Sequence, residues 1–199
     1  MKTILLKGEL RSEVGTRTAK ELRHKGMVPC VMYSDGKEAT HFAIYQADFK
    51  NLVYTPNAYK VKLNLDGTEY LAILQDTQFH PVSEAIIHAD FLEVAEGKKV
   101  VMEVPVRVVG NSPGVRAGGK LVKKINRLRL RGYLKDMPDY VDVSIDTLEI
   151  GQSAKVRVLS LENLDILDAP ENAIVSIKTT RALMQAAAEA AKAPKAGKK

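Results

Sequence analysis

Short apolar and β-branched runs, separated by turn residues, fill the first half of the chain. Runs of this kind are typical of β-strands. Asp66-Gly67, which lies between two such runs, is a strong signal for a two-residue hairpin turn. The segment 34–37 has the composition of another hairpin turn. The pattern predicts strands over residues 3–11, 29–33, 41–45, 59–65, 69–78 and 86–93.

Two segments in this half depart from the strand pattern. Residues 18–25 predict a short helix that ends at Gly26, and residues 47–54 predict a second one. Pro29 cannot continue the first helix and therefore opens a strand. Several short strands with two short inserted helices predict a small β-barrel.

The second half begins after a polar break at 96–99. Residues 100–109 alternate at period two, with Val100, Met102 and Val104 on one side, which predicts a half-buried strand. A turn-rich loop is expected over 111–119. Further strands are predicted over 121–133, 140–145, 153–158 and 173–178.

The chain is therefore predicted to be mostly β, with three parts. Residues 1–95 form the small barrel with two short helices, and residues 96–180 form a second all-β domain. Residues 181–199 form an Ala/Lys-rich tail that is partly helical or disordered. A helix is expected at 180–193, followed by a basic end at 194–199.

Basic residues are concentrated in three blocks, although the net charge of +6 is modest. Residues 1–25 hold seven Lys/Arg against three acids, and residues 115–135 hold eight against none. The last 19 residues hold five against one acid. Such blocks favour a polyanionic partner, above all nucleic acid. The plainer alternative is that they are solvated faces.

Composition excludes several classes of protein. The single cysteine, Cys30, rules out a disulfide framework and a multi-cysteine zinc site, which predicts a reducing, cytoplasmic setting. Cys30 lies in an apolar run and is expected to be a buried structural thiol. No apolar run is long enough to cross a membrane, and the first residues lack a signal-peptide core.

Amides, imidazoles and carboxylates gather in one region that otherwise reads as strand. Gln75 and Gln78 lie in it, followed by His88 and Asp90, which are two positions apart and so share a strand face. Such a face holds a metal, performs acid–base chemistry, or reads the hydrogen-bonding edges of a partner.

The first two uses fit the sequence poorly. Asp76, His80, His88 and Asp90 could supply metal ligands, but their spacing matches no familiar zinc pattern. No nucleophile elbow, phosphate-binding loop or dinucleotide fingerprint is present. A metal-dependent enzyme is therefore the weakest alternative, and the sequence predicts no cofactor and no catalysis.

Nucleic-acid binding fits better. Arg11, Arg17, Lys20 and Arg23 are placed to hold phosphates, which positions a protein without reading sequence. The polar strand residues are suited to base edges or 2′-hydroxyls, and Tyr33 offers a ring and a hydroxyl. The competing interpretation is that His88 and Asp90 are a satisfied strand pair that holds the barrel together.

Several motifs in the same order resemble one known family. Arg11, Gly15, Leu22-Arg23 and residues 29–33, 75–81 and 88–91 resemble the bacterial large-subunit ribosomal proteins that bind 5S rRNA. The second half resembles the longer, two-domain general-stress (Ctc) form through residues 114–121 and 148–151. The resemblance covers residues 3–180.

The resemblance implies a cytoplasmic, ribosome-bound structural protein whose barrel docks on the loop E region of 5S rRNA. The implied contacts, together with Arg17 from the charge argument, are Arg11, Lys20, Arg23, Tyr33, Gln75, Gln78, His88 and Asp90. A stress-linked RNA-binding protein loosely bound to the ribosome is the runner-up.

The chain departs from the family pattern in four places: the helix at Glu21, the turn at 33–36, the Lys-rich tail and the basic block at 115–135, of which the first and last bear most on RNA binding. Glu21 stands where relatives often carry arginine, which weakens the cationic contact of the helix. The basic block at 115–135 is unusually strong and is predicted to make a second rRNA contact through Arg116, Lys120, Lys123, Lys124, Arg127 and Arg129.

Overall fold

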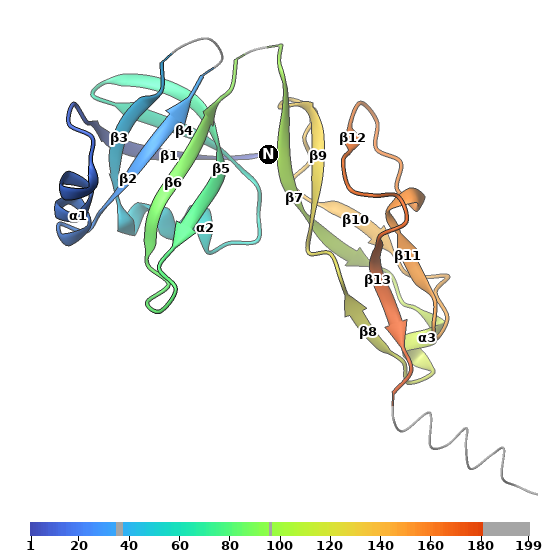
Figure 1. Ribbon diagram of the computed structural model, residues 1–199. Coiled ribbons are helices and arrows are strands. Elements are labelled where there is room, and N and C mark those ends of the chain that lie inside the picture. The colour runs from blue at the N-terminus through green and yellow to red at the C-terminus, as the bar shows by residue number, and fades with distance from the viewer. Residues whose placement is uncertain (35–37, 96, 181–199) are drawn as a thin grey trace, which may run out of the picture. The chain divides into compact units, whose positions relative to one another are not determined.

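Six strands close into a barrel in the first part of the computed structural model, which describes residues 1–34, 38–95 and 97–180 (Figure 1). Their order around the barrel is β1-β3-β2-β6-β5-β4. The strands are β1 (Lys2–Leu10), β2 (Met27–Tyr33), β3 (Thr40–Tyr45), β4 (Tyr59–Leu65), β5 (Thr68–Phe79) and β6 (Ile86–Glu93). The predicted barrel and its strands are thus confirmed to within a few residues.

The turn between β4 and β5 follows the sequence signal. Leu65 pairs with Thr68, so Asp66 and Gly67 form a two-residue loop. Both have positive φ, 47° and 93°, as the hairpin turns that match strand twist require. The other predicted hairpin turn, at 34–37, lies largely outside the described residues.

Two helical segments are inserted between the barrel strands, as predicted. Helix α1 (Thr16–His24) packs against β2, while η1 (Gln46–Phe49) continues into α2 (Lys50–Val53). Met27 and Val31 are buried although they alternate with the core residues Val28 and Cys30 on β2. This burial on both faces explains why β2 reads as a continuous apolar run.

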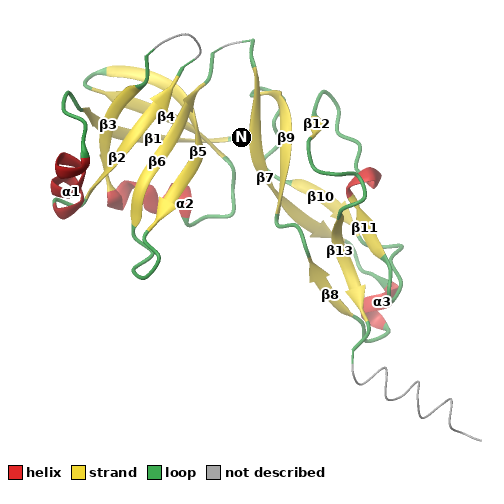
Figure 2. Ribbon diagram, viewed as in Figure 1, coloured by secondary structure: helices red, strands yellow, loops and turns green. Residues whose placement is uncertain are grey.

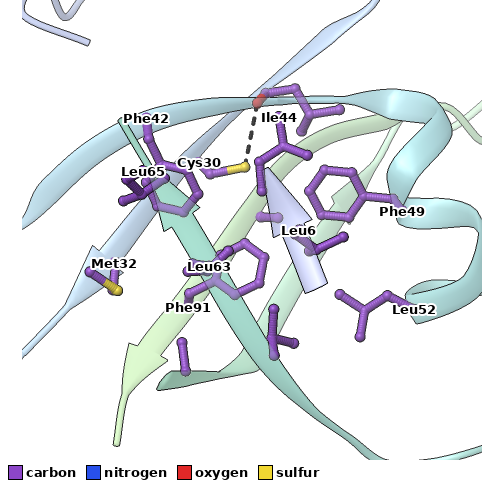
Figure 3. Close-up of a cluster of buried hydrophobic side chains, with 14 of the residues drawn as sticks. Leu6, Cys30, Met32, Phe42, Ile44, Phe49, Leu52, Leu63, Leu65 and Phe91 are labelled. Carbon is purple, nitrogen blue, oxygen red and sulfur yellow. Dashed lines mark hydrogen bonds between the residues drawn. The ribbon is translucent and has the colours of Figure 1, made fainter. Parts of the chain in front are cut away.

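The barrel interior is packed with aromatic and aliphatic side chains (Figure 3). Phe91 lies between Phe42 and Phe49, with ring centroids 5.7 and 6.3 Å away. Cys30 lies among them, and its thiol donates to the Val28 carbonyl at 3.4 Å. Burial raises the pKa of the Cys30 thiol, which confirms an inert structural cysteine.

The second part is also built of strands (Figure 2). One sheet has the order β10-β7-β9-β12, and a smaller sheet has the order β11-β13-β8. The strands are β7 (Lys99–Val109), β8 (Lys120–Lys123), β9 (Arg127–Tyr133), β10 (Val141–Ser144), β11 (Ser153–Lys155), β12 (Asp165–Ile166) and β13 (Ala173–Lys178). Val100, Met102 and Val104 are buried on β7, as their spacing predicts.

Three predictions in this part were wrong in detail. The strand expected over 121–133 is two strands in different sheets, because the chain leaves β13 at 124–126 and changes partner. The last residues of the strand expected over 153–158 form a 3-10 turn, η2 (Val156–Val158). The loop expected over 111–119 contains a single helical turn, α3 (Pro113–Arg116).

Other predictions lie beyond the described residues or stay untested. The helix expected at 180–193 and the basic end fall almost wholly outside the described part. The domain boundaries at 95/96 and 180/181 stay predictions. Among the described residues, no helix is long and apolar enough to cross a membrane.

Candidate nucleic-acid interface

Neighbouring strands β2, β6 and β5 bring the predicted polar residues onto one face of the barrel. In the antiparallel β5–β6 pair, Gln78 stands opposite His88 and Asp76 opposite Asp90. Ala89 and Phe91 are fully buried in the core, so the alternating residues His88 and Asp90 point outward. The polar residues therefore lie outside the barrel rather than within it.

Asp90 joins two side chains that are far apart in sequence. His88 Nδ1 lies 2.6 Å from Asp90 Oδ1, and the Tyr33 hydroxyl donates to Asp90 Oδ2 at 3.2 Å. The other ring nitrogen of His88, Nε2, takes no part in this contact. Both carboxylate oxygens are thus engaged, so Asp90 orients its neighbours.

The phenol of Tyr33 is kept as a neutral donor. Partial burial, then the negative charge of Asp90 and the hydrogen bond to it, raise the pKa of Tyr33. The Tyr33 side chain is nevertheless 44% exposed, so its ring is open to a partner. The site therefore offers an accessible ring whose hydroxyl is already held in place.

The two predicted glutamines occupy different positions. Gln78 is exposed beside His88 within the regular ladder. Gln75 is exposed where the β5–β6 register shifts between Leu74 and Asp76, so it has no partner residue on β6. Such bulges re-aim a side chain, which places the Gln75 amide apart from the outward row.

The predicted cations differ in how they are held. Arg23, in the last turn of α1, donates from Nε to the Ile87 carbonyl at 3.1 Å, which brings it next to His88 on β6. Arg17 pairs with Glu21 at 3.2 Å instead, and Lys20 is exposed on the same helix. Glu21, the residue that departs from the family pattern, therefore forms an ion pair with Arg17, one of the residues predicted to hold phosphate.

Arg11 follows the end of β1 and is anchored to β3. Its backbone N–H donates to the His41 carbonyl at 2.9 Å, and its guanidinium donates to the Glu13 carbonyl at 3.3 Å. His41 in turn stands opposite Val31 on β2. Two strands, β3 and β2, thus lie between β1, which Arg11 follows, and the row formed by His88 and Asp90 on β6.

Sequence reasoning considered Asp76 only as a metal ligand. The register places it directly opposite Asp90, where like charges destabilise a strand pair. The Tyr33 and His88 donors offset this cost at Asp90, and Asp76 Oδ1 accepts the Thr77 N–H at 2.8 Å. Asp76 belongs to the polar face, but only the strand register reveals this.

The metal alternative finds no support in the geometry. No group of three His, Cys, Asp or Glu side chains that could hold a metal occurs within residues 1–34, 38–95 and 97–180. His80 Nδ1 accepts the N–H groups of Val82 and Ser83 at 3.3 and 3.2 Å, so it closes a turn. His80 therefore does not join His88 and Asp90.

The second predicted contact set is spread over α3, β8 and β9. Arg127 and Arg129 are exposed on β9 and alternate with the buried Leu128 and Leu130, and both make interactions within the protein. The Lys123 ammonium donates a hydrogen bond to the Val106 carbonyl. The other three residues of this predicted contact set are also exposed: Arg116, Lys120 and Lys124.

The glycine-rich segment at 114–119 is a packing feature. Ser112 caps α3 by accepting the Gly114 N–H at 3.0 Å, and it donates to the Leu148 carbonyl at 2.5 Å. A Cβ on Gly114 would lie 2.7 Å from the backbone carbon of Glu149. The glycine is required by close backbone approach.

Comparison with known proteins gives matches over both parts of the chain. Residues 6–91 match the model of the Ribosomal L25p family, and residues 99–181 match that of the ribosomal protein TL5 C-terminal domain. A two-part β protein with these matches is a ribosomal protein.

Individual relatives span nearly the whole chain. A protein of Amoebophilus asiaticus is 47% identical over 190 residues, covering 96% of each chain. One from Phocaeicola vulgatus is 43% identical, covering 96% of this chain and 100% of the relative. Both are named large ribosomal subunit protein bL25. The chain therefore belongs to the bL25 family, in its two-domain form, as its motifs predicted.

Proposed function

We propose that this chain is a structural constituent of the large ribosomal subunit that binds 5S rRNA at its loop E region. The contact surface is the outer face of β2, β6 and β5, with α1 beside it. The observation that carries the proposal is the hydrogen-bonded row of Tyr33, Asp90 and His88 on the outside of the barrel. The protein acts on the ribosome in the cytoplasm and needs no cofactor.

The chemistry of this face suits irregular RNA. A regular A-form major groove is too narrow for side chains, so a protein reads RNA at distorted or unpaired regions. His88 Nε2 and the Gln78 amide supply acceptors and donors for base edges or 2′-hydroxyls, because Nδ1 of His88 is held by Asp90. The Tyr33 ring offers a stacking surface.

Cations of the barrel and of helix α1 would hold the RNA backbone. Arg23 is fixed beside β6, Lys20 is exposed on the same helix, and Arg11 follows β1. Contacts of this type set orientation and make affinity depend on salt. In this proposal Arg17 contributes less, because Glu21 competes with phosphate for its guanidinium.

The test is chemical footprinting of 5S rRNA with the full chain and its Gln78→Ala variant. Gln78 is exposed, so its loss leaves the barrel core intact. We expect protection of one internal-loop region by the parent chain and about tenfold weaker protection by the variant, in line with the loss of a well-placed polar contact to RNA. The charge-loss control is Lys62→Gln on β4, whose side chain is exposed and stands opposite Leu71.

Melting curves accompany both variants. Protection that is equal for the parent chain and Gln78→Ala, at equal melting temperature, contradicts the proposed contact surface. Absence of any protection by the parent chain contradicts 5S rRNA as the partner.

A further inference from the structure

Two lysines stand directly opposite each other in the smaller sheet. Lys120 and Lys178 are paired in the antiparallel register of β8 and β13; Figure 1 shows these two strands. Both side chains are exposed. Directly opposed residues have Cβ atoms about 4.5–5.5 Å apart on one face, so two like charges there destabilise the pair. Lys178 lies outside the predicted basic block, so the charge pattern of the sequence does not indicate this pair, and only the strand register does.

Other opposed charges in the second part are complementary. Arg107 stands opposite Asp142 and binds it in a bidentate pair at 2.7 and 2.8 Å. Arg131 stands opposite Asp165. In contrast to these oppositely charged pairs, the opposed residues Lys120 and Lys178 are both cationic, and neither has a carboxylate partner among the described residues. The repulsion between them is therefore left uncompensated within the described protein.

Edge protection explains only half of the pair. β8 is an edge strand of the order β11-β13-β8, and exposed lysines on edge strands discourage aggregation. Lys178, however, lies on the central strand β13, where no edge needs protection. Edge protection therefore does not account for both charges.

The surroundings hold the two strand ends in register. The Thr180 hydroxyl donates to the Gly118 carbonyl at 3.2 Å, which ties the end of β13 to the turn before Lys120. A Cβ on Gly119 would lie 2.6 Å from the side chain of Ile177, so the turn packs closely on β13. The two ammonium groups are thus carried on neighbouring strands whose ends are tied together.

We propose that Lys120 and Lys178 together bind a backbone phosphate of RNA, as a contact separate from the barrel face. Lysine binds phosphate as a point charge, and two lysines at opposed strand positions can direct several donors to the oxygens of one phosphate. An anion between them replaces repulsion with attraction. The contact is independent of sequence, and it goes beyond the proposed 5S rRNA site because it lies in the second part of the chain.

The test measures binding of the full chain to a labelled RNA duplex that contains no internal loop, over a range of salt concentrations. The variant is Lys120→Gln/Lys178→Gln, and the charge-matched control is Lys7→Gln/Lys62→Gln on β1 and β4, where both lysines are exposed. We expect the slope of log K against log salt to decrease by about one in the variant, because the variant loses one phosphate contact. The control slope stays close to that of the parent chain.

An equal decrease in variant and control overturns the proposal, as does an unchanged slope in the variant. Because the duplex lacks the proposed loop, Gln78→Ala leaves this slope unchanged whichever way the 5S rRNA footprint comes out. The two proposals therefore fail separately.

A second variant tests the pair without RNA. Lys178→Glu places a carboxylate opposite Lys120, which turns the repulsive pair into a cross-strand ion pair. We expect a higher melting temperature for the free chain together with a lower salt slope in duplex binding. A lower melting temperature overturns the charge conflict that carries the proposal.

Discussion

The Tyr33 hydroxyl donates a hydrogen bond to the Asp90 carboxylate at 3.2 Å, across two neighbouring strands of the barrel. The same carboxylate holds His88 at 2.6 Å through its other oxygen. One acidic residue thus fixes the orientation of two groups suited to RNA. This explains how a carboxylate can belong to the surface that we propose to bind a polyanion.

Removing the hydroxyl tests this arrangement. In Tyr33→Phe the ring stays, but Asp90 loses one of its two donors. We expect 5S rRNA affinity to decrease about 2- to 10-fold, which corresponds to one hydrogen bond. The control is Tyr54→Phe, which loses an exposed hydrogen bond to the Glu84 carbonyl and leaves the Tyr33–Asp90 contact intact. Equal affinities for the two variants in a gel-shift titration would show that the Tyr33 hydroxyl has no role.

The titration of Tyr33 reports on the same contact. Burial and Asp90 raise its pKa above the ordinary value of 10.0. Because the folded pKa is raised, the linked stability is complete below pH 10.0 and is lost as pH rises through the folded pKa. Asp90→Asn should lower the pKa of Tyr33 in an NMR titration. An unchanged pKa in that variant would contradict the contact.

The fold could be predicted from the sequence wherever a pattern is local. The hairpin at Asp66-Gly67 and the alternation of Val100, Met102 and Val104 depend on neighbours in the chain, and both are confirmed. The break at 124–126 was missed because the strand residues on either side look alike, whereas their pairing partners differ. Strand exchange between sheets depends on long-range pairing, which periodicity does not encode.

The candidate site shows the same division. That His88 and Asp90 share a face follows from their spacing, and the structure places them on the outside of the barrel. The position of Asp76 opposite Asp90, and of Gln75 at a bulge, depends on register between strands. The engagement of Lys123 by the Val106 carbonyl depends on a contact between distant segments. Sequence could name these residue types but could not place them.

Backbone packing around α3 predicts a sensitive glycine. In Gly114→Ala the new Cβ would meet the backbone of Glu149 and Ile150 at 2.7 and 2.8 Å. Backbone atoms cannot rotate away, so we expect a loss of about 1–3 kcal/mol, typical of overpacking. Hydrogen exchange should show faster opening of β8 and β13 and unchanged protection in the barrel. Val115→Ala, at an exposed position of the same helix, serves as control.

Acid sensitivity of the second part should depend on Asp146. The Asn111 N–H, followed by the Ser144 hydroxyl, holds the pKa of Asp146 below its ordinary value of 3.8. The linked stability is therefore present above pH 3.8 and is lost as pH falls through the lower, folded pKa. Asp146→Asn should flatten the decline of melting temperature in this acidic range. A decline as steep as that of the parent chain would contradict the assignment.

Hydroxyl-radical footprinting of the full chain, with and without 5S rRNA, tests the central account most directly because it needs no substitution. The account predicts that RNA slows oxidation of Tyr33 and His88, and leaves the exposed Leu5 on β1, across the barrel from β6, unchanged. Unchanged oxidation of Tyr33 and His88, with protection at Leu5, would place the RNA on another face and contradict the account.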